Sequence, residues 1–170
     1  DAGGQFTLSG ATSLTGGTII TLYLDSGASS GVTISLGSGS SMTGMSIFGD
    51  RLIVRSVAGS TAITNLDIDH ANDNGDASIS AILSSATTSA IILAADVELL
   101  VWTGSTFAPG GTITTEDIDI NGTLTMGTNA LTASGSFDAT GGNFSISGTT
   151  TFNSTSALNT ITMNGGTMSG

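Results

Sequence analysis

The residues best suited to chemistry lie in one acidic segment, residues 67–76, which reads DIDHANDNGD. Its four carboxylates and two amides supply oxygen atoms, and Ca²⁺ takes six to eight oxygen ligands. The segment therefore predicts a calcium site whose candidate ligands are Asp67, Asp69, Asn72, Asp73, Asn74 and Asp76. The alternative interpretation is a solvated, Asx-rich turn with Asn74 and Gly75 at its tip.

A second pair of acids, Asp117 and Asp119, stands in the stretch DIDING, which matches the first half of a calcium-binding EF-hand loop. The twelfth position of that loop should be Glu, but it is Thr128 here, so the EF-hand interpretation fails. The alternation of Asp and Ile instead predicts a strand with outward carboxylates. On such a strand the two acids could share a cation with a neighbouring coil or a second copy.

An enzymatic interpretation starts from His70, the single histidine, beside Asp67 and Asp69, with Arg51 and Arg55 upstream. Glycosidic cleavage needs a carboxylic acid and a base at a defined separation, and two positions along one strand face span roughly 6.5 to 7 Å. However, the chain has one Trp, one Tyr and no Lys with which to hold sugars or uronates. We expect no enzymatic activity, and keep a polysaccharide-cleaving enzyme as an alternative.

The composition limits the partners of this chain. It has 170 residues, a net charge of −11, only 9% charged residues and no Cys. Nucleic acid and anionic membranes require cationic groups, which are almost lacking, so we expect neither as a partner. No apolar run approaches the roughly 20 residues of a membrane span, so we expect no membrane insertion. Abundant Thr, Ile and Val favour strands over disorder.

The second half of the chain repeats a short phrase in which Gly is followed by Ser or Thr and then by an apolar residue. The phrase begins at Gly104, Gly122, Gly135, Gly148 and Gly166, at intervals of 18, 13, 13 and 18 residues. Repetition at this scale predicts a solenoid. We expect coils of about 13 to 20 residues, on the order of ten coils in all, with glycine supplying positive φ at the corners.

Alternating apolar and polar residues indicate strands with one buried face. In residues 18–24 the inward set is Ile20, Leu22 and Leu24, and in residues 65–69 it is Leu66 and Ile68. Later inward pairs are Ile118 with Ile120 and Phe144 with Ile146. The predicted strands of the first half are 19–24, 32–36, 45–48, 52–54, 63–68, 79–83, 91–93 and 97–102.

These patterns predict an all-β fold, a parallel β-helix (β-solenoid) of right-handed coil, as one continuous body over residues 1–170. The texture changes near 102/103: residues 1–102 hold longer, irregular strands and residues 103–170 hold regular Gly-Thr coils. The alternative is a β-sandwich in the first half followed by a short solenoid, since a Greek key also spaces strands at such intervals.

The Gly-Thr corners, Asn-Gly turns, Ser/Thr-rich faces and lack of Lys resemble the repetitive β-helix regions of large bacterial surface proteins, the adhesin and haemagglutinin type. This resemblance is one of style and is clearest in residues 103–170. It implies a parallel β-helix, an extracellular or cell-surface location and a role as an adhesin, stalk or fibre. No site of such a family maps onto individual residues.

We therefore expect an extracellular structural protein that associates with itself by end-to-end stacking of solenoid modules. The alternative is an adhesin module that binds glycans or a host surface. The last stretch, residues 160–170, carries no charge, and unguarded strand edges pair readily. The predicted self-association residues are Phe6, Leu8, Ile161, Met163, Thr167 and Met168.

Overall fold

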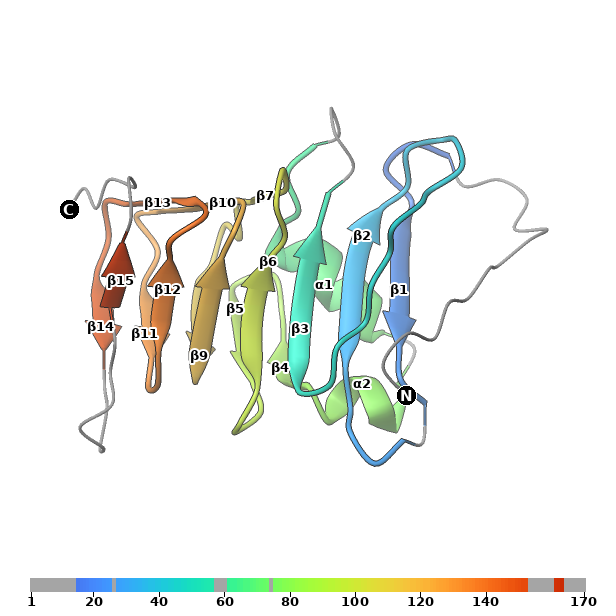
Figure 1. The fold of residues 1–170 in the computed structure, drawn as a ribbon, viewed down its shortest axis with the longest axis horizontal. Coiled ribbons are helices and arrows are strands. Elements are labelled where there is room, and N and C mark those ends of the chain that lie inside the picture. The colour runs from blue at the N-terminus through green and yellow to red at the C-terminus, as the bar shows by residue number, and fades with distance from the viewer. Residues whose placement is uncertain (1–14, 26, 57–60, 74, 153–160, 164–170) are drawn as a thin grey trace.

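The computed structural model describes residues 15–25, 27–56, 61–73, 75–152 and 161–163. It confirms the predicted fold class: 42% of the chain is strand and 9% helix, and parallel sheets stack as a β-solenoid of about six turns. Figure 1 shows the coils following one another along the long axis, with the first strands at one end and β15 at the other.

Three sheets form the walls of the solenoid. Sheet A has the strand order β1 (Ile19–Tyr23), β2 (Val32–Leu36), β3 (Arg51–Arg55), β6 (Glu98–Val101), β9 (Asp117–Ile120), β12 (Phe137–Ala139) and β15 (Ile161–Met163). Sheet B has β7 (Thr106–Phe107), β10 (Thr123–Gly127) and β13 (Asn143–Ile146). Sheet C has β4 (Leu83–Ala86), β5 (Ala90–Leu93), β8 (Thr112–Thr115), β11 (Leu131–Ala133) and β14 (Thr150–Phe152).

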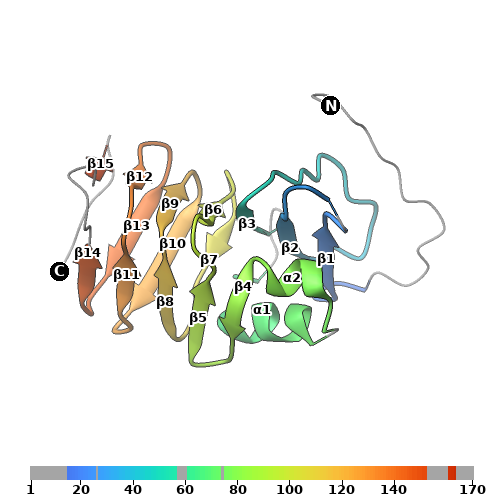
Figure 2. The ribbon, with the colours of Figure 1, turned by 90° about the horizontal axis from the view of Figure 1, so that it is seen from below.

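The coil is right-handed. From β2 to β15 the strands of sheet A run upward in the foreground of Figure 1, the chain crosses the top through sheet B, and β14 runs downward behind. The chain advances from right to left as it turns, and the view from below places sheets A and C on opposite sides (Figure 2). This is the hand expected of connections between parallel strands.

The coil length follows from the strand register rather than from the glycine phrase. In sheet A, Leu99 pairs with Ile118 and Ile118 with Phe137, so successive partners are 19 residues apart. The glycine phrase has shorter intervals because it marks different corners of the coil: Gly122 lies between β9 and β10, and Gly135 between β11 and β12. The expectation of ten coils was wrong for a second reason, namely that 47 residues separate Leu52 from its partner Leu99.

Apolar columns line the interior in each of the three sheets. One column from each sheet consists of Leu52, Leu99, Ile118 and Phe137 in sheet A, Phe107, Leu124 and Phe144 in sheet B, and Ile91, Ile113 and Leu131 in sheet C. All are at most 2% exposed, and each such side chain contributes about 1.5–3 kcal/mol of burial free energy. The predicted inward pairs Ile118 with Ile120 and Phe144 with Ile146 are confirmed.

Two predicted strands are helices instead. Residues 63–68 overlap α1 (Asn65–Asn72), and residues 79–83 overlap the end of α2 (Ala77–Ser80). Thr64 and Asp67 form a capping box at the start of α1: the Asp67 amide donates to Thr64 Oγ1, and the Thr64 amide donates to Asp67 Oδ2 at 2.8 Å. Ile68 is fully buried but Leu66 is 45% exposed, because the helix buries residues three positions apart rather than alternate ones.

One end of the solenoid is capped. There β1 pairs antiparallel with β2, and β4 pairs antiparallel with β5, whereas the other ladders are parallel. The two helices lie opposite β1 and β2, beyond the end of sheet C, and close the interior (Figures 1 and 2). Sheet B is continued only by a single bridge, Ile63 to Phe107, before α1 begins.

The cap also corrects the predicted facing of the first strand. Ile19 and Tyr23 pack against the core, whereas Ile20, Leu22 and Leu24 were predicted to do so. The pairing of Ile19 with Leu36 and of Tyr23 with Val32 sets this facing, and residues 18–24 do not encode that register. A β-sandwich in the first half is not found among the described residues, because β1, β2 and β3 belong to the same sheet as β6, β9 and β12.

Close stacking explains the glycine at one column of corners. A Cβ on Gly122 would lie 2.3 Å from the carbonyl oxygen of Trp102 and 2.5 Å from that of Ser105, in the preceding coil. Gly142 occupies the equivalent corner one coil later, and a Cβ there would lie 2.3 Å from the carbonyl oxygen of Gly122. Positive φ, the predicted reason for corner glycines, holds at Gly104 (φ 73°) but is not the reason at Gly122.

We therefore predict that Gly122→Ala lowers the free energy of unfolding by about 1–3 kcal/mol, because the added methyl group overpacks against rigid backbone. Urea denaturation followed by circular dichroism measures this. Gly16→Ala is the control, since a Cβ there meets nothing within 4 Å. Equal effects of the two substitutions would contradict the stacking argument.

Candidate functional site

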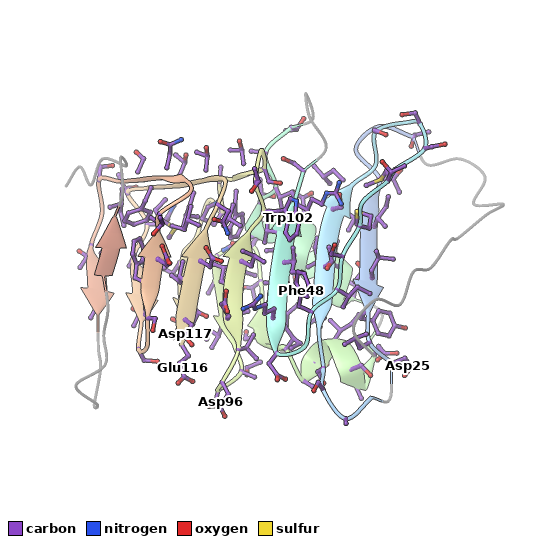
Figure 3. All side chains as sticks on the ribbon, viewed as in Figure 1. Asp25, Phe48, Asp96, Trp102, Glu116 and Asp117 are labelled. Atoms are coloured by element: carbon purple, nitrogen blue, oxygen red, sulfur yellow. The ribbon has the colours of Figure 1, made fainter. Side chains whose placement is uncertain are left out.

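The outer face of sheet A gathers most of the charge of the regular coils (Figure 3). Strand pairing aligns two columns across it: Arg51, Glu98 and Asp117 in one, and Ile53, Leu100, Asp119 and Asp138 in the other. Stacking neighbours in a sheet are about 4.8 Å apart, so like charges lie close together. We call this surface the acidic face.

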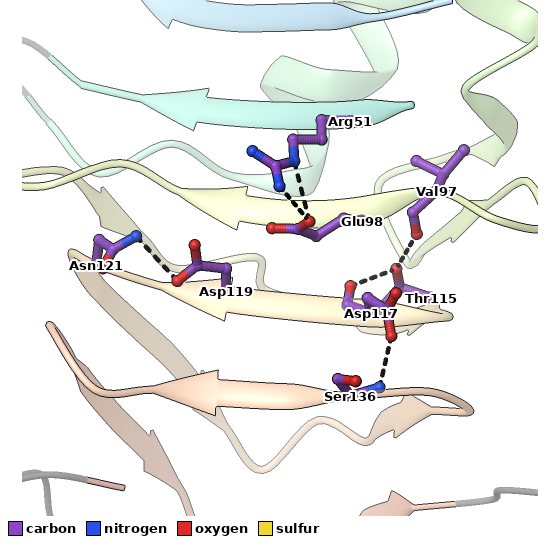
Figure 4. A network of polar contacts seen from close by, with 8 residues as sticks. All are labelled: Arg51, Val97, Glu98, Thr115, Asp117, Asp119, Asn121 and Ser136. Carbon is purple, nitrogen blue, oxygen red and sulfur yellow. Dashed lines mark hydrogen bonds and ion pairs between the residues drawn. The ribbon is translucent and has the colours of Figure 1, made fainter. Parts of the chain in front are cut away.

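The acidic face begins at an ion pair between adjacent strands. Arg51 Nη2 lies 2.9 Å from Glu98 Oε2, and Arg51 Nε donates to the same oxygen at 2.9 Å (Figure 4). Burial raises the pKa of Glu98 above its usual value, and Asp119 and Asp117 raise it further, while Arg51 opposes them. Arg51 thus pairs with an outward acid of the adjacent strand.

Asp119 is held less firmly than Glu98 is held by its ion pair with Arg51. Its Oδ1 accepts a hydrogen bond from Nδ2 of Asn121, the residue that follows β9, at 2.9 Å. Burial raises the pKa of Asp119 and the neighbouring Asp138 raises it further, whereas Asn121 and Arg51 lower it. The net effect is that ionised Asp119 costs free energy in the folded state.

The remaining acids on this side bind main-chain amides. Asp117 Oδ1 accepts from Ser136 N at 2.5 Å, in the next coil, and Glu116 Oε2 accepts from Asp96 N at 2.7 Å, in the preceding region. Figure 4 shows the Ser136 contact together with Thr115 Oγ1, which lies 3.1 Å from the carbonyl oxygens of Val97 and Asp117. These bonds tie one coil to the next.

An aromatic pair lies beside Arg51, at the edge of the acidic face. Phe48 and Trp102 stack with ring centroids 6.2 Å apart, and the Arg51 guanidinium lies 5.7 Å from the Phe48 centroid. The segment before β3 crosses the outer face of β2, where Thr33 Oγ1 donates to Ser46 O at 2.6 Å. The pair thus lies where this covering segment meets the acidic face.

Beneath that cover lies a small apolar cluster outside the solenoid, which the sequence analysis missed. Ile53 is 1% exposed and Leu100 is 3% exposed, although both point away from the interior columns. The signal was present: the unbroken apolar runs 52–54 and 99–102 indicate strands buried on both faces. Arg55 donates to the carbonyl oxygens of Thr43 and Gly44.

The predicted calcium ligands of residues 67–76 are distributed along the helical cap. Asp67 completes the capping box of α1, and Asp76 caps α2 through a bond from Ser78 N at 2.8 Å. Asp76 Oδ2 also accepts from Tyr23 Oη at 3.1 Å, which ties α2 to β1. The other predicted ligands there are Asp69 and Asn72 in α1, Asp73 at its C-terminal end, and Asn74, which lies outside the described residues.

Among the residues that the structure describes, no group of three or more His, Cys, Asp or Glu is placed to hold a metal ion. Asp117 and Asp119 lie on β9, two positions apart, as the strand interpretation predicted. Calcium binding stays a prediction from the sequence. The paired-carboxylate hypothesis loses its geometric premise, because Asp67 and Asp69 lie on a helix and not on one strand face.

The predicted self-association residues lie only in part within the described chain. Ile161 and Met163 bound β15, which pairs with β12 at the end of sheet A. Phe6, Leu8, Thr167 and Met168 lie outside the described residues.

A scan of protein-family models found no match to this chain, and searches of curated proteins and of solved structures also found none. In the part of the chain that the structure describes, no helix is long and apolar enough to cross a membrane. The functional argument therefore depends on the geometry and chemistry of the chain itself.

The acidic face predicts a pH-dependent stability. Glu98 and Asp119 have raised pKa values in the folded state. At a pH between the ordinary and the raised pKa values, the folded protein therefore binds more protons than the unfolded chain. The free energy of unfolding should therefore rise as pH falls from 7 toward the ordinary carboxyl pKa values near 4. The melting temperature should be higher at pH 5 than at pH 7, as measured by circular dichroism.

Asp119→Asn should raise the melting temperature at pH 7 by about 1–3 °C and weaken its dependence on pH. The substitution removes the charge that faces Asp138 and Glu98 while keeping an acceptor for Asn121. Asp73→Asn, which removes one charge from the exposed end of α1, controls for the change in net charge. An equal rise in both variants would refute the local explanation.

Proposed function

We propose that this chain is a structural protein, a segment of an extracellular stalk or fibre that lengthens by adding β-solenoid coils. The observation that carries the proposal is the difference between its two ends. One end is capped by antiparallel strands and helices, and at the other end the last strands of the three sheets, among the residues that the structure describes, are β13, β14 and β15. We call these three strands the elongation edge.

The elongation edge has backbone groups oriented for a further coil. Leu131 pairs with Thr150, and Leu131 N donates to Thr149 O at 3.0 Å. In a parallel ladder this pattern turns the amide and carbonyl of Thr150 itself away from β11. Asn143 N likewise donates to Gly122 O, which turns the amide of Phe144 away from β10. Such groups are a template for another strand.

The capped end gives the assembly a direction. A coil added beyond β1 would have to pair with an antiparallel strand at the edge of sheet A and displace the two helices that close the interior. We therefore propose that stacking occurs at the elongation edge alone, where the uncapped edge of a like solenoid, or the elongation edge of a second copy of this chain, would pair with β13, β14 and β15. Parallel stacking of one continuous hydrogen-bonded wall suits a load-bearing stalk.

Two further features support the same function. The described acids make structural bonds: Asp67 and Asp76 cap helices, and Glu116 and Asp117 bind amides of other coils. The resemblance to bacterial surface proteins, carried by the Gly-Thr corners and Ser/Thr-rich faces, supports the proposed extracellular location. We do not propose polysaccharide cleavage, because its candidate carboxylate Asp67 is engaged in the capping box.

A proline at the elongation edge tests the proposal. Thr150→Pro removes one outward amide from the first residue of β14, a position where proline is tolerated. Sedimentation velocity over a range of concentrations should show the parent chain associating into larger species. Thr150→Pro should weaken that association by about tenfold in concentration, roughly 1.4 kcal/mol.

Thr150→Val is the matched control, since it keeps the amide and nearly the same side-chain volume and should associate as the parent does. Circular dichroism confirms that both variants remain folded. A parent chain that stays monomeric at every concentration, or equal weakening by both substitutions, would overturn the proposal.

A further inference from the structure

Charge is segregated around the circumference of the regular coils. The charged residues of the described segment 98–152 are Glu98, Glu116, Asp117, Asp119 and Asp138. Four of them lie on sheet A, and Glu116 lies in the corner that leads into it. The strands and corners of sheets B and C in this segment carry none, so the solenoid has one anionic side and two neutral ones.

The outer face of sheet C carries an ordered threonine array. Pairing aligns Thr114, Thr132 and Thr151 in one column across β8, β11 and β14. Thr112 and Thr149 lie in the neighbouring column, with Ala130 of the intervening coil between them. Thr112, Thr114, Thr149 and Thr151 are exposed, while Thr132 is half-buried. We call these five residues the threonine array. Ile92, 40% exposed, continues the first column onto β5.

The array repeats along one column and, on two of its strands, along the strand. Neighbouring strands place Thr114, Thr132 and Thr151 about 4.8 Å apart, and alternate residues such as Thr112 and Thr114 are roughly 6.6 Å apart along one strand. Each threonine offers a hydroxyl group, which donates and accepts, beside a methyl group. Its χ1 is restricted by β-branching and its backbone is fixed in the sheet, so little entropy is lost on binding.

We propose that the threonine array binds the surface of an uncharged, hydroxyl-rich polysaccharide whose chains lie side by side. Such a surface repeats, as the array does, and presents hydroxyl groups and C–H faces that match the threonine hydroxyls and methyls. Polyanions are repelled by the net charge of −11. An average protein surface fits less well, because about a quarter of its residues are charged and would be desolvated without a counter-charge.

This surface is separate from the elongation edge. The array lies on the outer face of sheet C, whereas the edge uses backbone groups that point along the solenoid axis. Each added coil that keeps threonine at these positions lengthens the array, so stacking would increase the number of contacts with the polysaccharide without a new type of contact. Binding and assembly can therefore be measured apart.

The test is depletion of the chain from solution by particles of microcrystalline cellulose and of chitin, with a polygalacturonate gel as the anionic comparison. We expect depletion by at least one neutral particle and none by the gel. The double substitution Thr114→Glu with Thr132→Glu should weaken the affinity for the neutral particle about tenfold, because two carboxylates would be desolvated. Thr103→Glu with Thr140→Glu adds the same charge at exposed corners between sheets A and B and should bind as the parent does.

Thr114→Val with Thr132→Val keeps the shape and removes the hydroxyl groups, so binding should fall. Binding that is unchanged or stronger in this variant would show adsorption through apolar contact and would overturn the proposal. So would failure of both neutral particles to deplete the parent chain. The Thr150→Pro variant should still bind, which separates this result from the outcome of the assembly experiment.

Discussion

The in-register stacking of one coil on the next is the constraint on which the rest of the structure depends. Each coil must present its backbone to the preceding one at the spacing of a sheet, through three walls and the corners between them. At the corner of Gly122 this spacing leaves no room for a side chain, since the carbonyl oxygens of Trp102 and Ser105 already occupy it. Inside, the same register turns alternate residues into columns such as Leu99, Ile118 and Phe137.

A stack of parallel strands has two edges, and the two edges of this solenoid differ in structure. At the first edge, β1 and β4 reverse direction, and α1 and α2 fill the space where sheets B and C would otherwise continue. Tyr23 and Asp76 join the reversed strand to the second helix. At the other edge β13, β14 and β15 keep the parallel direction of the coils. Capping one edge and leaving the other parallel favours lengthening over closure.

The regular coils were predictable from the sequence because one period governs them. In residues 112–146 every second residue of a strand is buried, and alternation alone identifies Ile118, Ile120, Phe144 and Ile146 as interior. The cap was not predictable in this way. Residues 65–69 alternate for so short a stretch that a helix burying Ile68 and Ala71 fits them equally, and only the Thr64–Asp67 capping pair distinguishes the two. The facing of β1 depends on pairing with β2, which no local pattern contains.

For the candidate sites, the residue types could be predicted from the sequence, but the residues that surround them could not. Outward Asp119 was evident, but its neighbour Asp138 is 19 residues away, and the register that joins them comes from the whole coil. Stacking multiplies whatever a position carries: an aspartate becomes a column of repelling charges with raised pKa, and a threonine becomes a row of hydroxyl groups. A solenoid can repeat a threonine at one position through any number of coils, whereas each further aspartate in a column adds electrostatic repulsion. That difference gives a physical reason for neutral threonine on the outer face of sheet C and for acids confined to the side of sheet A, where Arg51 and main-chain amides offset them.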